Sequence, residues 1–152
     1  MAKNGILDLR DWDFDKEGPT SLRGEWELVE GALLSPIGFN NSKMKVYETV
    51  PGGWKSDKAI GTYRLIVYLP NDVKNIGISV RNIWSSHVLY VNGKKVKQMG
   101  KPSSTIEKTI NKNVPYEYYQ SVEEHKLELV IQVANYVNTD SGIVQPIDIG
   151  ID

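Results

Sequence analysis

Apolar and polar residues alternate in four segments of the chain. In the segment TYRLIVYL at 62–69, every second side chain from Tyr63 to Leu69 is apolar or aromatic. The segments 76–80 (IGISV), 127–133 (LELVIQV) and 147–151 (IDIGI) repeat this pattern. A period of two places successive side chains on opposite faces of a β-strand. Each segment is therefore predicted to be a strand with one face in the core, and no helical period of comparable length competes.

Turn-forming residues separate these segments. Asn92-Gly93 lies between HVLYV and KKVKQM, and Asn-Gly suits the two central positions of a type I′ hairpin turn, where both residues need positive φ. Strands spaced about ten residues apart predict an all-β fold, an antiparallel β-sandwich or jelly roll. A single helical turn is expected around 30–34. Further turns are expected at Gly18-Pro19, Pro36, Pro51-Gly52-Gly53, Pro70-Asn71-Asp72, Pro102 and Asp140-Ser141-Gly142.

Composition bounds the classes of function. The chain has 152 residues and no internal repeat or linker, so we expect one domain over 1–152. A net charge of −1 gives no general attraction to nucleic acid or anionic lipid. Because there is no cysteine, disulfides, thiolate chemistry and cysteine-based zinc sites are excluded. No run of about 18 apolar residues predicts a membrane span. The lysines between 94 and 101 lack interleaved aromatics and are expected to form a solvated hairpin tip.

The acidic segment DWDFD at 11–15 has the spacing of the first three ligands of an EF-hand loop. The sixth position of that loop is lysine rather than glycine, and the twelfth is leucine rather than glutamate. The calcium motif therefore fails. We expect instead an extended segment with its two aromatic side chains packed inward and its aspartates in solvent.

No motif for catalysis or metal binding is recognisable. His87 and His125 are the only histidines, so a metal site would need carboxylates from elsewhere in the fold. Ser85, Ser86 and His87 are adjacent, whereas catalytic triads are assembled in space from separated residues. No nucleophile elbow, HExxH sequence or phosphate-binding glycine loop is present. We predict no enzymatic activity, no catalytic residue, no metal and no cofactor.

The aromatic residues are the best candidates for a ligand site. Trp26 alternates with glutamates in GEWEL and is expected in the core. Trp54 follows the turn 51–53, Trp84 precedes two serines, and three tyrosines cluster in PYEYY at 115–119. Rings in loops can stack on the apolar face of a pyranose while neighbouring polar groups bind its hydroxyls. The alternative, which the sequence leaves open, is that these rings fill the ends of a sandwich.

Five pieces of the chain occur in a recognisable order: LRGEWELVEGALLSP, VPGGW, GTYRLIVYLP, HVLYVNGKKV and NYVNTDSGIVQPIDIG. Together they resemble the galactose-binding-like jelly-roll domain at the N-terminus of many bacterial membrane signalling proteins. These include seven-transmembrane receptors with diverse intracellular signalling modules, sensor histidine kinases and adenylate cyclases. The same order is similar to the sugar-binding domain of family 2 glycoside hydrolases. The matching positions, most of them architectural in character, are Gly24, Trp26, Pro51, Trp54, Tyr63, Arg64, Asn92 and Gly93.

The first resemblance implies a non-catalytic sensor domain on the extracellular or periplasmic side of the bacterial cytoplasmic membrane. Residues 1–152 would then be an excised N-terminal part of a longer membrane protein, joined to the membrane only by segments outside this chain. Its ligand would be a carbohydrate or another small molecule, and nucleic acid is not an expected partner. Two alternatives stay open: a structural or protein-interaction domain without a small ligand, and an accessory sugar-binding domain of a secreted glycoside hydrolase.

Any ligand site is expected at the loop ends of the sandwich. Trp54 or Trp84 would supply the ring, with His87 and Arg64 as hydrogen-bonding residues. His87 opens the strand just after Trp84, so the two are expected to share a rim. Arg64 falls on the polar face of its strand, and its five donors suit the recognition of hydroxyl or carboxylate groups.

Overall fold

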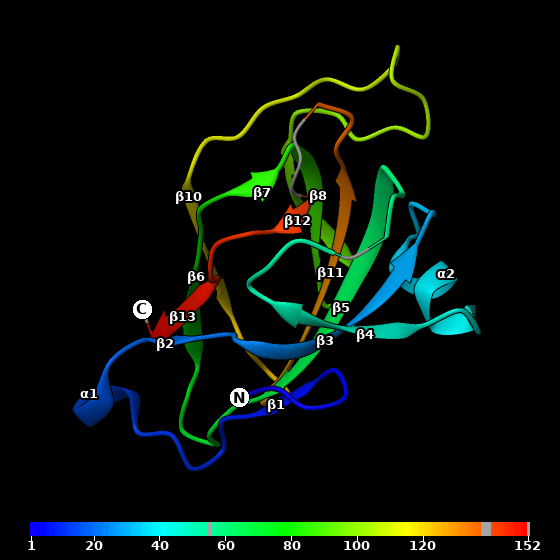
Figure 1. Cartoon of the computed structure of the whole chain (residues 1–152). Helices are drawn as coiled ribbons and strands as arrows, with labels where there is room; N and C mark the ends of the chain where they lie inside the picture. Colours follow the sequence, from blue (N-terminus) through cyan, green and yellow to red (C-terminus); the bar gives the residue numbers. More distant parts are fainter. Residues whose placement is uncertain (55, 138–140, 152) are drawn as a thin grey trace.

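A computed structural model describes residues 1–54, 56–137 and 141–151, which form two stacked β-sheets (Figure 1). The large sheet has the strand order β4-β3-β5-β11-β8-β9, and β1 pairs parallel to β5. Its other neighbouring strands are antiparallel. The strands of this sheet are β1 (Ile6–Asp8), β3 (Gly24–Glu30), β4 (Val46–Val50), β5 (Ile60–Tyr68), β8 (Ser86–Val91), β9 (Lys94–Met99) and β11 (Lys126–Ala134).

The second layer is a small sheet with the strand order β10-β6-β13-β2. Its strands are β2 (Thr20–Ser21), β6 (Asn75–Val80), β10 (Tyr116–Ser121) and β13 (Asp148–Ile151). A separate short pair joins β7 (Ile83–Trp84) to β12 (Gly142–Ile143). The expected all-β sandwich or jelly roll is confirmed. The tyrosines of PYEYY, however, lie on strand β10 rather than in a loop.

The hydrophobic core lies between the two sheets and follows the predicted alternation. Every second side chain from Tyr63 to Leu69 is fully buried, and the apolar positions of β6 and β11 join them. Trp26 is also fully buried, as expected, and its indole N–H donates to the carbonyl of Leu22 at 2.9 Å. That hydrogen bond lets a large ring with a polar atom sit in the core without an unpaired donor.

The DWDFD segment differs from expectation, because a helical turn, α1 (Phe14–Glu17), replaces the extended conformation. The Asp13 carboxylate caps it and accepts from the backbone N–H groups of Asp15 and Lys16 at 3.1 and 3.2 Å. An aspartate that supplies an N-cap favours a helix start over an extended strand. Phe14 is nevertheless buried and Trp12 half-buried, so the inward packing of both rings is as predicted.

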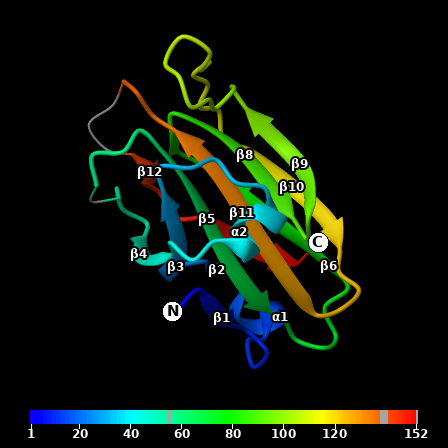
Figure 2. The ribbon, with the colours of Figure 1, turned by 90° about the vertical axis from the view of Figure 1, so that its right-hand side faces the viewer.

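The second helix, α2 (Pro36–Asn41), lies six residues beyond the place expected for a helical turn. The prediction at 30–34 is wrong, because β3 continues to Glu30 and the cap comes only at Ser35. The Ser35 hydroxyl accepts from the N–H of Gly38, and proline occupies the first helical position. Both features are typical helix starts. Figure 2 shows α2 lying over the outer face of the large sheet.

The Asn92-Gly93 hairpin between β8 and β9 is confirmed by its backbone. Asn92 has a φ of 50° and Gly93 a φ of 82°, which is the positive pair that a type I′ turn requires. The strand that follows, β9, is an edge of the large sheet and carries three lysines. Charged edge strands resist pairing with other chains, so this edge is protected.

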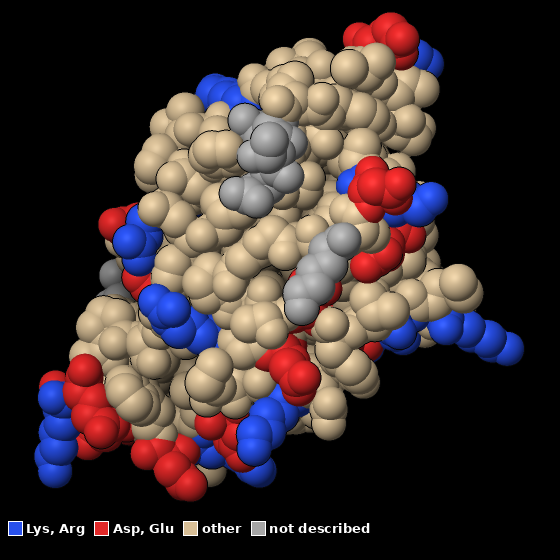
Figure 3. All heavy atoms as spheres, viewed as in Figure 1, with Lys and Arg blue, Asp and Glu red and all other residues tan. Residues whose placement is uncertain are grey.

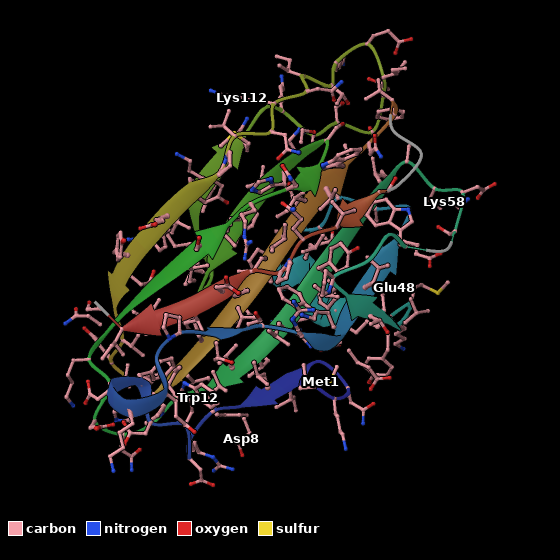
Figure 4. The ribbon with its side chains drawn as sticks, turned by 60° about the vertical axis from the view of Figure 1, so that its left-hand side comes forward. Met1, Asp8, Trp12, Glu48, Lys58 and Lys112 are labelled. Carbon is pink, nitrogen blue, oxygen red and sulfur yellow. The ribbon has the colours of Figure 1, made fainter. Side chains whose placement is uncertain are left out.

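The two ends of the sandwich differ in chemistry. Figure 4 labels Lys58 and Lys112 at one end and Asp8 and Trp12 at the other. We call the first the loop end, made by the segments 51–54, 56–59 and 100–115 with β7 and β12. Acidic and basic side chains crowd the opposite end around α1, whereas uncharged atoms cover most of the middle of the face in Figure 3. Neither helix in the described ranges is long and apolar enough to cross a membrane.

Candidate ligand-binding site at the loop end

Trp54 lies at the loop end, but its ring points into the sandwich. The residue is only 7% exposed, and its indole N–H donates to the Lys58 carbonyl at 2.9 Å. The ring packs against Tyr63 with a centroid separation of 6.0 Å, and Tyr63 in turn contacts Trp26 at 6.1 Å. The glycine of β12, Gly142, leaves room for the ring, because a Cβ there would lie 3.2 Å from it. Trp54 thus continues an aromatic row into the core.

Trp84 lies beside the same strand and keeps part of its surface in solvent. It is half-buried and pairs with Gly142 in the short β7–β12 ladder. Its indole Nε1 is buried and has no hydrogen-bond partner within the protein. The structure therefore brings Trp54 and Trp84 next to the same residue, Gly142, with the N–H of Trp54 satisfied and the N–H of Trp84 unpaired.

The 100–115 segment covers this end and is bonded to Ser85. The Ser85 hydroxyl donates to Asn111 Oδ1 at 2.7 Å, and the Ser85 carbonyl accepts from the Lys112 N–H at 3.1 Å. Two residues along, the side-chain oxygen of Asn113 is buried and has no partner. In Figure 1 this segment arches over the top of the sandwich between β9 and β10. Polar side chains from separate parts of the chain thus meet around Ser85.

His87 is fully buried between the two sheets. Its Nε2 lies 2.7 Å from the hydroxyl oxygen of Tyr116, and the two rings stack with centroids 5.7 Å apart. The other ring nitrogen, Nδ1, has no partner within the protein. Burial, and after it the positive charge of Lys97, lowers the pKa of His87 to about 4. The ring is therefore neutral at pH 7 and offers one unpaired polar atom.

Arg64 lies away from the other three predicted site residues. Its guanidinium projects from the outer face of β5, where two of its nitrogens bond Glu27 at 3.0–3.2 Å and a third bonds Asn40. It also lies 4.9 Å from the ring centre of Phe39 in α2. A half-buried cation that is held by a buried carboxylate and covered by a helix is tied into the fold. Arg64 does not share a rim with Trp84 and His87.

Sequence reasoning did not single out Asn111, Asn113 or Lys97 for this end. The length of the connection between β9 and β10 could have pointed to these residues, because connections of more than about 12 residues without strands or helices are commonly functional. No three His, Asp or Glu side chains come together in a group suited to a metal ion within the described part of the chain. The loop end can therefore offer hydrogen bonds and ring surface to a ligand.

Neither a protein-family model nor a curated protein sequence matches this chain. Solved structures do match it. A β-glucuronidase from an uncultured Clostridium species aligns with 86% of the chain at 15% identity and a TM-score of 0.64. The β-glucuronidase of Ruminococcus gnavus aligns with 88% at 15% identity and a TM-score of 0.61. A GH2 β-galacturonidase from Eisenbergiella tayi aligns with 86% at 13% identity and a TM-score of 0.59.

The fold resembles a β-sandwich domain of family 2 glycosidases. The chain spans 24–29% of the length of these three enzymes, which is the size of one domain within them. At such low identity the likeness concerns the fold alone. The similarity to family 2 glycoside hydrolases expected from the sequence is thereby confirmed for the fold, and the receptor sensor domain stays a prediction.

Proposed function

We propose that the chain is a non-catalytic, extracytoplasmic sensor module of a bacterial signal-transduction receptor, with its ligand bound at the loop end. The ligand is a carbohydrate or another small molecule. Trp84 supplies ring surface and the indole N–H, and the neighbourhood of His87 supplies further polar contacts. The observation that carries the proposal is that three buried polar atoms without a partner, on Trp84, His87 and Asn113, lie within two residues of Ser85 or of its hydrogen-bond partner Asn111 in the sequence.

Buried polar atoms without a partner need a physical explanation. A buried donor or acceptor without a partner costs about 1–3 kcal/mol, and native proteins keep few of them. A bound polyol offers both donors and acceptors in a small volume. A ligand that bonded Trp84 and Asn113 together would tie the 100–115 segment to β7 and so change the surface that this end presents. Such a change is what a sensor module passes on to a membrane segment outside this chain.

Two alternatives have specific observations in their favour. The fold likeness to glycosidase domains favours an accessory sugar-binding domain of a secreted family 2 hydrolase. Exposed apolar side chains on α2, on β4 and between them favour a protein-interaction domain, and these are Ile37, Met44, Val46 and Tyr47. The full-length gene separates the first alternative from the proposal. A downstream run of about 20 apolar residues indicates a receptor, and a downstream catalytic barrel indicates a hydrolase.

Replacing Trp84 by phenylalanine tests the proposed site. The variant keeps a ring but loses the unpaired N–H, so its stability should stay within about 0.5 kcal/mol of the wild type. Its affinity for the bound sugar should fall about tenfold, as expected for one lost hydrogen bond. The measurement is a titration with a glycan library followed by tryptophan fluorescence, with urea unfolding of both proteins alongside.

Trp12→Phe is the matched control. Trp12 is also half-buried, but it lies at the opposite end and its N–H already donates to the Gly18 carbonyl at 2.9 Å. This variant should lose a little stability and keep full affinity. Unchanged binding in Trp84→Phe, or no response to any sugar in the library, would contradict the proposed site.

A further inference from the structure

On the outer face of the small sheet, two paired positions on neighbouring strands carry no side chain. Gly77 of β6 lies directly opposite Gly150 of β13, and Tyr119 of β10 lies opposite Gly77 on its other side. Neither glycine has a left-handed backbone conformation, so the backbone does not require glycine at either place. What the two glycines provide is close approach to the backbone: the Tyr119 ring lies against Gly77 and the Pro19 ring against Gly150, and no side chain of either glycine stands between the two rings. Figure 4 shows β10, β6, β13 and β2 side by side in front of the large sheet.

The rings of Tyr119 and Pro19 flank this pair of glycines on either side. A Cβ on Gly77 would lie 2.7 Å from the Tyr119 ring, and a Cβ on Gly150 would lie 3.4 Å from the Pro19 ring. Tyr119 thus rests against Gly77, yet it stays 51% exposed. The hollow between these rings has a volume of about 270 Å³, close to the lower end of the range of about 300–1,000 Å³ for small-molecule sites. It is large enough for one sugar ring.

Polar side chains line the sheet next to the two glycines. Two residues along each strand, Ser79 lies between Glu117 of β10 and Asp148 of β13. Because side chains two apart share a face, this row borders the same hollow. The Asp148 carboxylate is held in place by the Ser21 hydroxyl at 2.7 Å and by the Arg81 guanidinium at 2.8 Å. The Glu117 carboxylate accepts from the Tyr119 hydroxyl.

The charges of this row select the class of ligand. Glu117 and Asp148 present carboxylate oxygens, each of which can accept more than one hydrogen bond. The guanidinium of Arg81 is already paired with Asp148. A ligand therefore meets acceptors and a net negative charge, which suits the hydroxyl donors of a neutral sugar and repels a sugar acid.

We propose that this hollow, the glycine groove, binds a neutral pyranose unit between the Tyr119 and Pro19 rings, beside Gly77 and Gly150, with its hydroxyls bonded to Glu117 and Asp148. The Tyr119 and Pro19 rings flank its apolar edges. A second hollow of about 460 Å³ begins at Pro19 and Asp148 and continues past Ser21, so a longer chain can extend beyond the first unit. The glycine groove is independent of the proposed receptor role, since it lies on the small sheet and not at the loop end.

Calorimetric titration with cellotetraose, maltotetraose, xylotetraose and tetragalacturonic acid tests the glycine groove. We expect at least one of the three neutral chains to bind and the acidic chain to bind more weakly. Amide resonances of 77–79, 117–119 and 148–150 should shift on binding. Tyr119→Ala should weaken binding roughly tenfold, the loss expected when one aromatic contact is removed. Gly150→Ala should weaken it too, because a methyl group would then stand between the two rings.

The Gly150→Ala variant is expected to fold, since its methyl group meets Pro19 at an ordinary contact distance of 3.4 Å. A loss of binding in this variant would therefore not result from misfolding. Tyr47→Ala is the control for Tyr119→Ala, because Tyr47 is a tyrosine of equal exposure, 52%, on the far edge strand β4. It should leave affinity unchanged. Three results would overturn the proposal: no neutral chain binds, tetragalacturonic acid binds as tightly, or Tyr119→Ala changes only stability or oligomeric state.

Discussion

Replacing Trp54 by alanine is expected to lower the free energy of unfolding by about 3–5 kcal/mol, the usual cost of removing a large buried ring. The ring is almost fully buried, packs on Tyr63 and fills space left by Gly142. The substitution leaves a cavity and also removes the donor for the Lys58 carbonyl. Urea unfolding followed by circular dichroism measures the loss.

Tyr47→Ala again serves as the comparison, because an exposed ring contributes within about 0.5 kcal/mol. If Trp54→Ala were to cost less than about 1 kcal/mol, the row from Trp54 through Tyr63 to Trp26 would not be part of the core. Trp54 would then be available for a ligand, as the sequence alone allowed.

Lowering the pH from about 6.5 to 4 is expected to destabilise the protein by about 3 kcal/mol through His87 alone. The folded-state pKa of His87 is about 4, below the ordinary value of 6.5. The unfolded chain therefore takes up a proton in this range that the folded chain does not. Stability from this group is fully present above pH 6.5 and is lost as the pH falls toward 4. Lys97 and Tyr116 are the titratable groups that face the ring.

The comparison of wild type with His87→Gln isolates this effect. Both proteins contain His125 and the same carboxylates, so the difference between their profiles of unfolding free energy against pH belongs to His87. That difference should change steeply between pH 4 and 6.5 and be flat above pH 7. A difference that stays constant across the whole range would mean that His87 titrates normally in the folded protein.

The strands could be predicted because burial on one face imposes a period of two. The segments 62–69 and 127–133 carry the pattern in full and pair with each other at the centre of the large sheet. The Asn92-Gly93 turn was equally accessible, since its residues meet a local backbone requirement. In both cases the determining physics lies within a few residues of sequence.

The two helices were missed for a related reason. A helix start depends on the one side chain that caps it. The prediction for this strand-rich chain rested on the alternation of apolar and polar residues, which does not report caps. Asp13 and Ser35 are both residue types that favour helix N-caps. The sequences next to them, however, are equally compatible with a loop. The hydrogen bonds of one capping side chain separate the helical from the loop conformation.

The site residues could be sorted only in three dimensions. Trp54 and Trp84 look alike in sequence, since each follows or precedes a turn. What distinguishes them is β12, more than fifty residues further along the chain, which covers one ring and pairs beside the other. The partners of Arg64 are likewise distant, with Glu27 on β3 and Phe39 in α2. The glycine groove arises from the register of three strands, which a single sequence does not specify.

The place of β11 has a consequence for how a cell makes this protein. The strand lies in the middle of the large sheet, between β5 and β8, yet it follows both of them in the chain, and β8 by more than thirty residues. Until residue 134 has emerged, β5 and β8 each keep an unpaired edge on the side that β11 later occupies, and their apolar faces are not yet covered. Unpaired edges of this kind invite association with other chains. The large sheet therefore cannot close before residue 134 has emerged, and chaperones that shield nascent strands should matter for its yield.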